Sequence, residues 1–340
     1  MGLDVIADYF RQFAKDCSGS SRLYESLSER IAGDRELLQL SSEAKKGQPI
    51  PNLLFGAVHY LLMKGKVHPL AKYYGTFVAE PDAAEEAFPA FKQFCEQYRD
   101  DILPILAIKN VQTNEVRRCA YLYPVFCSIY ASMQRPLSLI EIGTSAGLQL
   151  HWDRYGYSYS SKPGKIYGNP DSELVLSSEM RGRDWPELLL LSPPVTNRVG
   201  IDLHVNDLSE AEDCLWLQAL IWPEHAERRA SFDKAASIAT RVGARLVQGN
   251  GVKLLAELAG ETDSESVLCV FHTHVANQLS KRDKEELLLT IEGLGRQRDV
   301  CHIYNNMRDR QLHVDSYKGG VRQEIIVAET DGHGRWFNRI

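Results

Sequence analysis

A short stretch in the middle of the sequence joins a buried strand to a turn of small residues. Residues 137–142 are an apolar run of strand length that ends in Glu141-Ile142, and a helix is expected over 148–154. Strand, tight turn and helix N-terminus together build a nucleotide site in open α/β sheets, because small residues let a ligand approach the backbone and the first helical N–H groups face an anionic group. Glu141 could accept a hydrogen bond from a ligand's amino or hydroxyl group. The turn consists of Gly143, Thr144, Ser145, Ala146 and Gly147.

The glycine spacing excludes two common nucleotide motifs. In the dinucleotide fingerprint G-x-G-x-x-G, counted from Gly143, glycines would stand at Ser145 and Leu148. A phosphate loop ends in Gly-Lys-Ser/Thr, whereas Gly147 is followed by leucine. What remains is E-x-G-x-(small)-x-G, which predicts either a nucleoside site or a purely structural strand–turn–helix.

Polar residues also follow the other expected strands, where a parallel sheet would bring them to one edge. Asp202 is our candidate for an acid that accepts from both ribose hydroxyls, with Asp207 and Glu224 as rivals. Asn250 could pair with an adenine edge, and it could equally be a turn asparagine. No G-x-S-x-G elbow of a serine hydrolase occurs.

Two histidines stand two residues apart after an expected strand over 266–271. On an extended segment, His272 and His274 would point to the same face. The spacing permits metal binding with His302 as a third ligand, but no compact carboxylate cluster accompanies them and we expect no metal. The two histidines are our catalytic candidates, with His272 as the substrate-facing base; a satisfied structural pair is the alternative.

A polar segment interrupts the helical first third of the chain. Asn114 or Thr113 suits a helix N-cap, and Glu115 would follow in the first turn, where the helix dipole favours an acid. The next helix, over 116–133, is apolar nearly all round and is therefore expected to be buried. The polar side chains at the start of this helix must then find hydrogen-bond partners inside the protein, either as a helix cap or in contact with a ligand. The candidate substrate or domain-interface residues are Gln112, Asn114, Glu115 and Arg118.

Length and composition are those of a soluble globular protein. The 340 residues suffice for one large or two ordinary domains, with 44% hydrophobic and 25% charged residues. A net charge of −6 gives no general attraction to nucleic acid, and no apolar run approaches a membrane span. The seven cysteines form no C-x-x-C pair and the first residues lack a signal peptide's features, so we expect a cytoplasmic protein with reduced thiols.

The order of the expected elements predicts an α/β fold. Residues 1–133 show only helical periodicity, which indicates an N-terminal all-α cap domain. From residue 134 to 340, strands alternate with helices of 10–15 residues, which predicts a doubly wound, mostly parallel, Rossmann-like sheet. Within this domain, residues 156–197 are expected to be a β-containing insertion.

Four segments together resemble a bacterial family of unknown function. They cover most of the chain, and their combination is far more specific than the glycine turn alone. The segments are Gln112-Thr113-Asn114-Glu115-x-x-Arg118, Glu141-Ile-Gly-Thr-Ser-Ala-Gly-Leu with Asp153-Arg154-Tyr155, Gly200-Ile-Asp202-Leu, and Trp216-Leu-x-Ala-Leu-Ile-Trp-Pro-Glu224 with Arg228.

That family in turn resembles the S-adenosylmethionine-dependent methyltransferases of class I. The resemblance implies S-adenosylmethionine as cofactor and names no substrate and no oligomeric state. The cap domain and the insertion would select the acceptor, which we expect to be a small molecule, and the composition predicts neither a nucleic-acid nor a membrane partner. Ser145 stands where these enzymes usually have glycine, and Asn250 stands where an acid is usual. The alternative is therefore a non-catalytic protein that keeps the fold and binds a nucleoside or nothing. The residues that would hold the cofactor are Glu141, Gly143, Thr144, Ser145, Gly147, Asp202 and Asn250.

Overall fold

A computed structural model describes residues 2–340, and the chain divides into two compact units. The first comprises Met1–Thr113 and Ser209–Ala230, and the second comprises Asn114–Leu208 and Ser231–Ile340. The predicted boundary at residue 133 is therefore wrong. The apolar helix over 119–133 belongs to the second unit, because its buried side chains pack against the sheet there, and residues 209–230 return to the first unit.

The first unit is helical, as predicted for the N-terminal region. Short polar residues begin its helices: Ser21 accepts a hydrogen bond from the backbone N–H of Tyr24, and Asp34 accepts from two N–H groups. Phe55 is at the centre of the core, with its ring stacked 4.3 Å from that of Tyr24. The elements are α1 (Leu3–Cys17), α2 (Arg22–Ile31), α3 (Arg35–Ser41), α4 (Ile50–Met63), η1 (Pro69–Tyr73), η2 (Ala84–Glu86), α5 (Ala87–Gln97), α6 (Arg99–Ile108), α8 (Ala211–Ala219) and the start of α9 (Ala226–Val242).

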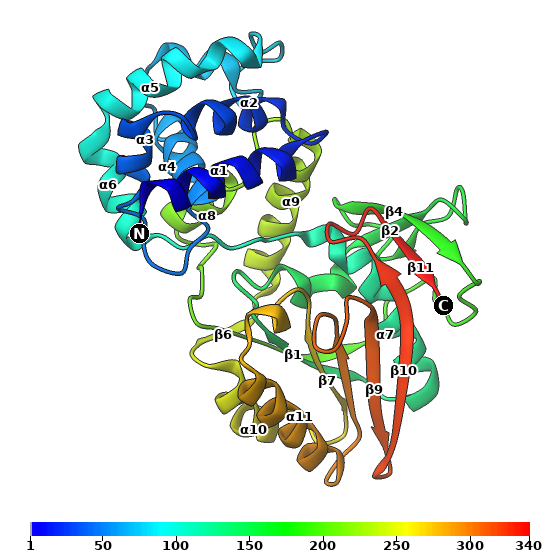
Figure 1. Ribbon diagram of the computed structural model, residues 1–340. Helices are drawn as coiled ribbons and strands as arrows, with labels where there is room; N and C mark the ends of the chain where they lie inside the picture. Colours follow the sequence, from blue (N-terminus) through cyan, green and yellow to red (C-terminus); the bar gives the residue numbers. More distant parts are fainter. Residues whose placement is uncertain (1) are drawn as a thin grey trace. The chain divides into compact units, whose positions relative to one another are not determined.

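The second unit contains an 11-stranded sheet with the strand order β3-β2-β4-β11-β10-β9-β8-β7-β1-β5-β6 (Figure 1). The predicted mixed α/β fold with a mostly parallel sheet is confirmed, although the far half of the sheet carries antiparallel pairs. The strands are β1 (Leu137–Ile142), β2 (Gly156–Tyr159), β3 (Tyr167–Gly168), β4 (Val175–Gly182), β5 (Val195–Asp202), β6 (Arg245–Gln248), β7 (Val267–His272), β8 (Val300–Tyr304), β9 (Leu312–Lys318), β10 (Val321–Thr330) and β11 (Trp336–Arg339).

Five of these strands, β6-β5-β1-β7-β8, run parallel and form one half of the sheet. Numbered by their order along the chain, they stand as 3-2-1-4-5. In doubly wound sheets with this order, the order of successive strands reverses between the first and fourth strands, and ligands bind beyond the carboxyl ends at that point. In this protein, that switch point lies between the ends of β1 and β7.

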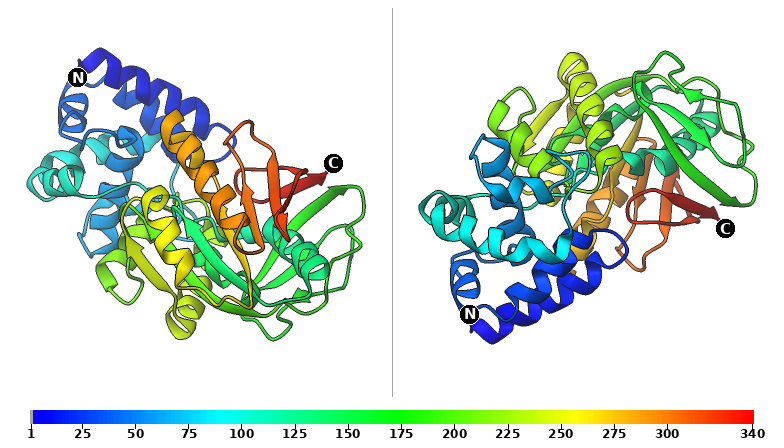
Figure 2. Two further views of the ribbon diagram at one scale, coloured as in Figure 1. Left: turned by 90° about the horizontal axis from the view of Figure 1, so that it is seen from below. Right: turned by 90° about the horizontal axis from the view of Figure 1, so that it is seen from above.

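Helices cover both faces of the parallel strands. Leu268 and Val270 of β7 share a core with α10 (Gly251–Gly260) and α11 (Lys281–Gly295). Phe271 points to the opposite face because strand side chains alternate, and its ring lies 5.6 Å from Phe126 of α7 (Cys119–Met133). Figure 2 gives two further views of these layers. All six residues of β7 and of β1 are consequently buried, as strands between two helical layers should be.

The far half of the sheet begins with a meander, β8-β9-β10-β11, in which neighbouring strands are antiparallel. β11 pairs in parallel with β4, and β4 pairs with β2. The predicted insertion over 156–197 does contain β structure, since β2, β3 and β4 fall within it and join this edge of the main sheet. The predicted helix over 148–154 is the 3₁₀ helix η4 (Leu148–Arg154). The remaining short elements are η3 (Val116–Arg118) and η5 (Ala276–Gln278).

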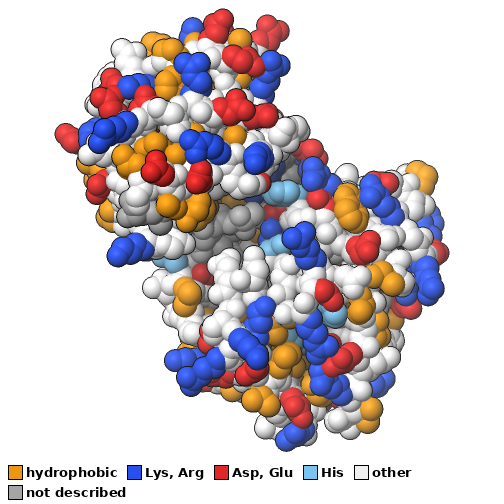
Figure 3. All heavy atoms as spheres, in the orientation of Figure 1, with side chains coloured by type: hydrophobic (Ala, Val, Ile, Leu, Met, Phe, Trp, Pro, Cys, Tyr) orange, Lys and Arg blue, Asp and Glu red, His pale blue; other side chains and the backbone are white. Residues whose placement is uncertain are grey.

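Charged side chains of both signs are interspersed on the face of each unit seen in Figure 3. Within residues 2–340, no helix is both long and apolar enough to cross a bilayer.

Candidate functional site

The loop over residues 143–147, called here the motif loop, connects β1 to η4 and is held by its own hydrogen bonds. Gly143 (φ +76°) and Gly147 (φ +73°) take left-handed backbone conformations that favour glycine. The N–H groups of Gly143 and Thr144 donate to the carbonyl oxygen of Ile201, and the N–H of Gly147 donates to that of Thr144. The loop therefore offers a ligand fewer free donors than a phosphate-binding turn does.

Ser145 is the centre of the remaining contacts. Its φ of +51° is unusual for a residue with a side chain. Its N–H donates to Asp202 Oδ2 (2.8 Å), and its hydroxyl oxygen accepts from Asn114 Nδ2 and Asn206 Nδ2, both at 3.0 Å. The N–H of Ala146 donates to Asn114 Oδ1 (3.4 Å). The structure thus brings together three predicted site residues, Asn114, Ser145 and Asp202, and adds Asn206, which sequence reasoning missed.

The same contacts correct two details of the sequence analysis. Asn114 does not cap the following helix; Glu115 is the N-cap residue of η3, and its side chain accepts from the N–H of Arg117 (3.2 Å). Gly143 does not leave open space for a ligand, because a Cβ atom there would stand 2.3 Å from Val275 Cγ2. This glycine is required by packing and backbone conformation.

Glu141 closes β1 beside the motif loop, with a side chain only 3% exposed. Its Oε2 accepts from Thr144 Oγ1 at 2.6 Å. Burial raises the pKa of Glu141 to about 8; the Thr144 hydroxyl opposes that shift, and the nearby Asp202 carboxylate adds to it. At neutral pH, Glu141 is therefore largely a neutral acid that can lose its proton when a cation arrives.

Arg118 reaches the end of β7 from η3. The residue is 7% exposed, and its Nε donates to the carbonyl oxygen of Gly332 (2.9 Å) in the turn between β10 and β11. Its Nη1 makes longer contacts with the carbonyl oxygen (3.5 Å) and Oγ1 (3.4 Å) of Thr273. Thr273 Oγ1 also contacts the side-chain amide of Gln149. Beside this cluster, His333 Nδ1 lies 3.2 Å from Glu115 Oε2. These contacts thus join separate chain segments at one edge of the sheet. The residues involved are Arg118, Thr273, Gln149 and Gly332.

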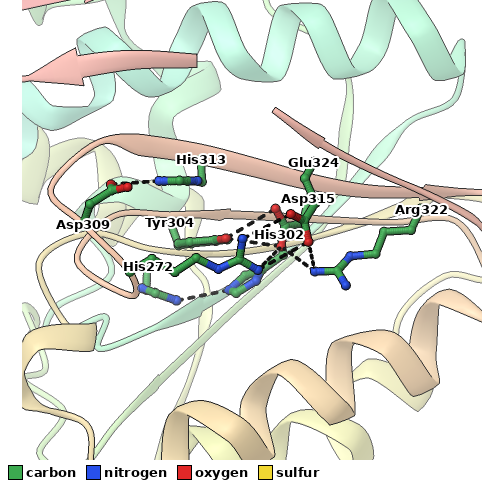
Figure 4. A network of polar contacts seen from close by, with 9 residues as sticks. His272, His302, Tyr304, Asp309, His313, Asp315, Arg322 and Glu324 are labelled. Atoms are coloured by element: carbon green, nitrogen blue, oxygen red, sulfur yellow. Dashed lines mark hydrogen bonds and ion pairs between the residues drawn. The ribbon is translucent and has the colours of Figure 1, made fainter. Parts of the chain in front are cut away.

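His272 lies deeper than predicted. It has no exposed surface, and its Nε2 lies 3.1 Å from Nε2 of His302 on β8, as Figure 4 shows. Burial lowers the pKa of His272 to about 3 and that of His302 well below its usual value, so both rings are neutral. The ring of Tyr304 stacks with that of His272 and is tilted against that of His302, and its hydroxyl donates to Asp315, which also contacts Arg322 (Figure 4). This network crosses β7, β8, β9 and β10.

His274 is placed differently, because the segment after β7 is not extended. His274 has a φ of +58°, so it does not share the direction of His272, and the expectation that both face the same way is wrong. Its N–H donates to Asn305 Oδ1 (2.7 Å) and its Nδ1 lies 3.3 Å from Asn306 Nδ2. Since an amide nitrogen donates, Nδ1 is the acceptor and the neutral ring carries its proton on Nε2. Burial lowers the pKa of His274 to about 4.

The remaining predicted site residues make other contacts, belong to the first unit or are exposed. The Asn250 side chain accepts from the N–H groups of Val252 and Lys253 and caps α10. Gln112 belongs to the first unit, as does Glu224, which accepts from Ser21 Oγ and the N–H of Leu23. Asp207 occupies an exposed position. Asp202, at the end of β5, contacts the motif loop through the N–H of Ser145.

Within the described part of the chain, no three His, Cys, Asp or Glu side chains are grouped as metal ligands would be. Sequence reasoning did not identify Asn206, Gln149 or His333 as site residues. One signal was present for His333, since the tail Asp331-Gly332-His333-Gly334 has the composition of a tight turn. Asn206 and Gln149 stand in segments without any such pattern.

A search of curated proteins found no match for the sequence. Residues 7–339 match the family described as uncharacterized protein conserved in bacteria (DUF2332). The match spans nearly the whole chain, both units included, and the chain therefore belongs to this bacterial family.

Proposed function

We propose that this protein binds S-adenosylmethionine at the switch point between β1 and β7 and transfers its methyl group to a small-molecule acceptor. The observation that supports this most is the 3-2-1-4-5 order of the parallel strands, with Glu141 and Asp202 at the carboxyl ends of the adjacent strands β1 and β5. An ammonium group and two ribose hydroxyls need acceptors, and carboxyl groups at this edge are suited to them.

The residues fit such a cofactor through these acids rather than through the motif loop. Asp202 already accepts from the N–H groups of Ser145 and His204, yet a carboxylate has about four acceptor sites, so it can also bind a hydroxyl. Glu141 would lose its proton and bind the ammonium group of the cofactor as a carboxylate. When bound, the cofactor supplies an activated methyl group, and the chain's task is to hold the acceptor in line with it. His274, with its proton on Nε2, is the better placed of the two predicted histidines to contact the acceptor.

A non-catalytic nucleoside-binding protein is the second candidate. It is favoured by the closed motif loop, in which the N–H groups of residues 143–147 all donate to protein oxygens. Such a protein would bind S-adenosylhomocysteine as well as S-adenosylmethionine and would turn neither over.

Isothermal titration with S-adenosylmethionine and S-adenosylhomocysteine tests the proposal. We expect binding by the wild type and at least tenfold weaker binding by Glu141→Gln, which mimics the neutral acid but cannot become a carboxylate. Ser145→Gly is the matched control in the motif loop; it relieves the φ of +51° and should leave affinity within about twofold. No binding by a folded wild type at about 1 mM ligand would refute both candidates, and binding without methyl transfer to any acceptor in an extract would favour the second.

A further inference from the structure

Arg118 carries a buried positive charge that meets only neutral oxygens. Its hydrogen bonds go to the carbonyl oxygens of Gly332 and Thr273 and to the Thr273 hydroxyl, and the described residues place no carboxylate in ion-pair contact with it. Buried guanidinium groups are normally paired with an anion, because removing a charge from water is costly. The nearby Glu141 accepts from Thr144 Oγ1 and makes no ion pair with Arg118 among the described residues, and burial raises the pKa of its carboxyl group.

Three further polar side chains near Arg118 have a buried atom without a hydrogen-bond partner among the described residues. They are Tyr121 Oη, Asn305 Nδ2 and His274 Nε2, and the side chains of Tyr121 and Asn305 have no exposed surface. Tyr121 lies beside Arg118 and Thr273, and His274 lies within the electrostatic influence of Arg118. Unpartnered buried polar atoms are few in proteins and each calls for an explanation.

All three unpartnered groups can donate a hydrogen bond. The Tyr121 hydroxyl is neutral, since burial raises its pKa. The Asn305 amide is oriented by its Oδ1, which accepts from the N–H of His274 and from Asn306 Nδ2, so the free atom is the nitrogen. His274 carries its proton on Nε2 because Nδ1 accepts from Asn306. A guanidinium with three additional donors matches an anion and not a cation.

We propose that Arg118, Tyr121, His274 and Asn305, called here the donor cluster, bind the carboxylate of a small-molecule ligand. The inference stands apart from the proposed function, because it needs no nucleoside. Glu115 is the nearby acid, and its carboxylate contacts His333 Nδ1 and the N–H of Arg117. Asp331 is paired with Arg335. The Thr273–His274 segment and Asn305 place the cluster at the carboxyl ends of β7 and β8.

The chain offers a matched pair of tyrosines for the test. Tyr121→Phe removes a hydroxyl that lies near the Thr273 side chain without a hydrogen bond of normal length, so the melting temperature should change little. Tyr123, one half-turn later in α7, donates to the carbonyl oxygen of Leu189 at 2.8 Å. Tyr123→Phe should therefore lower the melting temperature and leave ligand binding as it is. Asn305→Asp keeps the acceptor for the N–H of His274 and replaces the free donor with an acceptor.

The probes are acetate, succinate, citrate and a set of 2-oxo and 2-amino acids, each with its amide as a neutral control. We expect at least one carboxylate, and none of the amides, to raise the melting temperature of the wild type and to bind in calorimetry. Tyr121→Phe should weaken that binding about tenfold, and Arg118→Met or Asn305→Asp about 100-fold. Absence of binding by every carboxylate, or wild-type affinity in folded Tyr121→Phe, would overturn the inference.

Two nucleosides separate the possible sources of the carboxylate and keep the two proposals distinct. S-adenosylhomocysteine carries an amino-acid carboxylate, and 5′-methylthioadenosine lacks it. A loss of affinity for S-adenosylhomocysteine alone in Tyr121→Phe would assign the cluster to the cofactor. Unchanged nucleoside binding with lost succinate binding would assign it to the acceptor. If the protein binds carboxylates but no nucleoside, only the proposed function is refuted. If it binds no carboxylate, and it binds nucleosides equally well with and without Tyr121→Phe, only this inference is refuted.

Discussion

His272 and His302 lie with their Nε2 atoms 3.1 Å apart, and neither side chain has any exposed surface. One ring must donate its Nε2–H and the other must accept with a lone pair, so the accepting ring must be neutral. Their burial makes the folded protein sensitive to acid, because it lowers the pKa of both rings. The unfolded chain protonates histidine near pH 6.5, whereas the folded chain protonates His272 only near pH 3.

We therefore expect the free energy of unfolding to fall as the pH decreases from about 6.5 toward 3. Each such histidine contributes a slope of about 1.4 kcal/mol per pH unit in this range. The double variant His272→Gln/His302→Gln should lower the slope by roughly two such contributions, measured by urea unfolding between pH 4.5 and 6. His59, buried in the first unit with its pKa lowered to about 3, serves as a reference, since His59→Gln should remove one contribution. An unchanged slope in the double variant would show that the pair is not neutral.

Glu141 should have the opposite effect at higher pH. Its pKa is raised from about 4.5 to about 8, so the folded state favours the neutral acid and loses stability as the pH rises through that window. Glu141→Gln should remove this loss, so its stability relative to the wild type should improve by about 1.4 kcal/mol per pH unit between pH 5 and 8. Thermal unfolding of both proteins at pH 5, 6.5 and 8 measures this difference; parallel curves would contradict it.

Gly143 should be sensitive to substitution for reasons of packing. Gly143→Ala places a Cβ atom 2.3 Å from Val275 Cγ2 at a φ of +76°, and we expect a loss of about 2–4 kcal/mol in the free energy of unfolding. Gly164 has the same φ, but a Cβ atom there would meet no other atom within 4 Å, so Gly164→Ala should cost only about 1 kcal/mol. Gly143→Ala/Val275→Ala should recover part of the difference, and strict additivity of the two changes would contradict the packing explanation.

Asn250 should behave as a helix cap. Its side chain accepts from two N–H groups at the start of α10, so Asn250→Ala should cost about 1 kcal/mol, while Asn250→Asp should keep both bonds and the stability. If S-adenosylhomocysteine binds, Asn250→Asp should leave its dissociation constant unchanged. A selective loss of affinity in that variant would instead support the contact with adenine expected from the sequence.

Much of the parallel half of the sheet follows from sequence patterns. The run over 137–142 and the similar run before His272 are buried between two helical layers, and such strands are recognisable as continuous apolar segments. The antiparallel half could not be derived in the same way. β10 is largely exposed, and β11 has only four residues, so neither shows a clear alternation of apolar and polar residues.

The candidate site was predictable in part for a related reason. Asn114, Arg118 and Asp202 stood out by their chemistry, but their contacts depend on backbone conformations that the sequence does not disclose. The positive φ of His274 turns it away from the direction of His272, and Ser145, whose φ is also positive, donates its N–H to Asp202. Asn206 is recognisable only from the hydrogen bond that its amide donates to Ser145.

The interleaved order of the two units along the chain has a consequence for synthesis on the ribosome. The first unit needs Ser209–Ala230, which follow strands β1 to β5 of the second unit. At about 5–20 residues per second, the helices up to Thr113 must wait on the order of ten seconds for their last partner. During that interval, the apolar surface that α8 later covers, including Gly56 of α4 opposite Trp216 and Leu220, has no intramolecular cover. The nascent chain should therefore be a substrate for ribosome-associated chaperones until residue 230 has emerged.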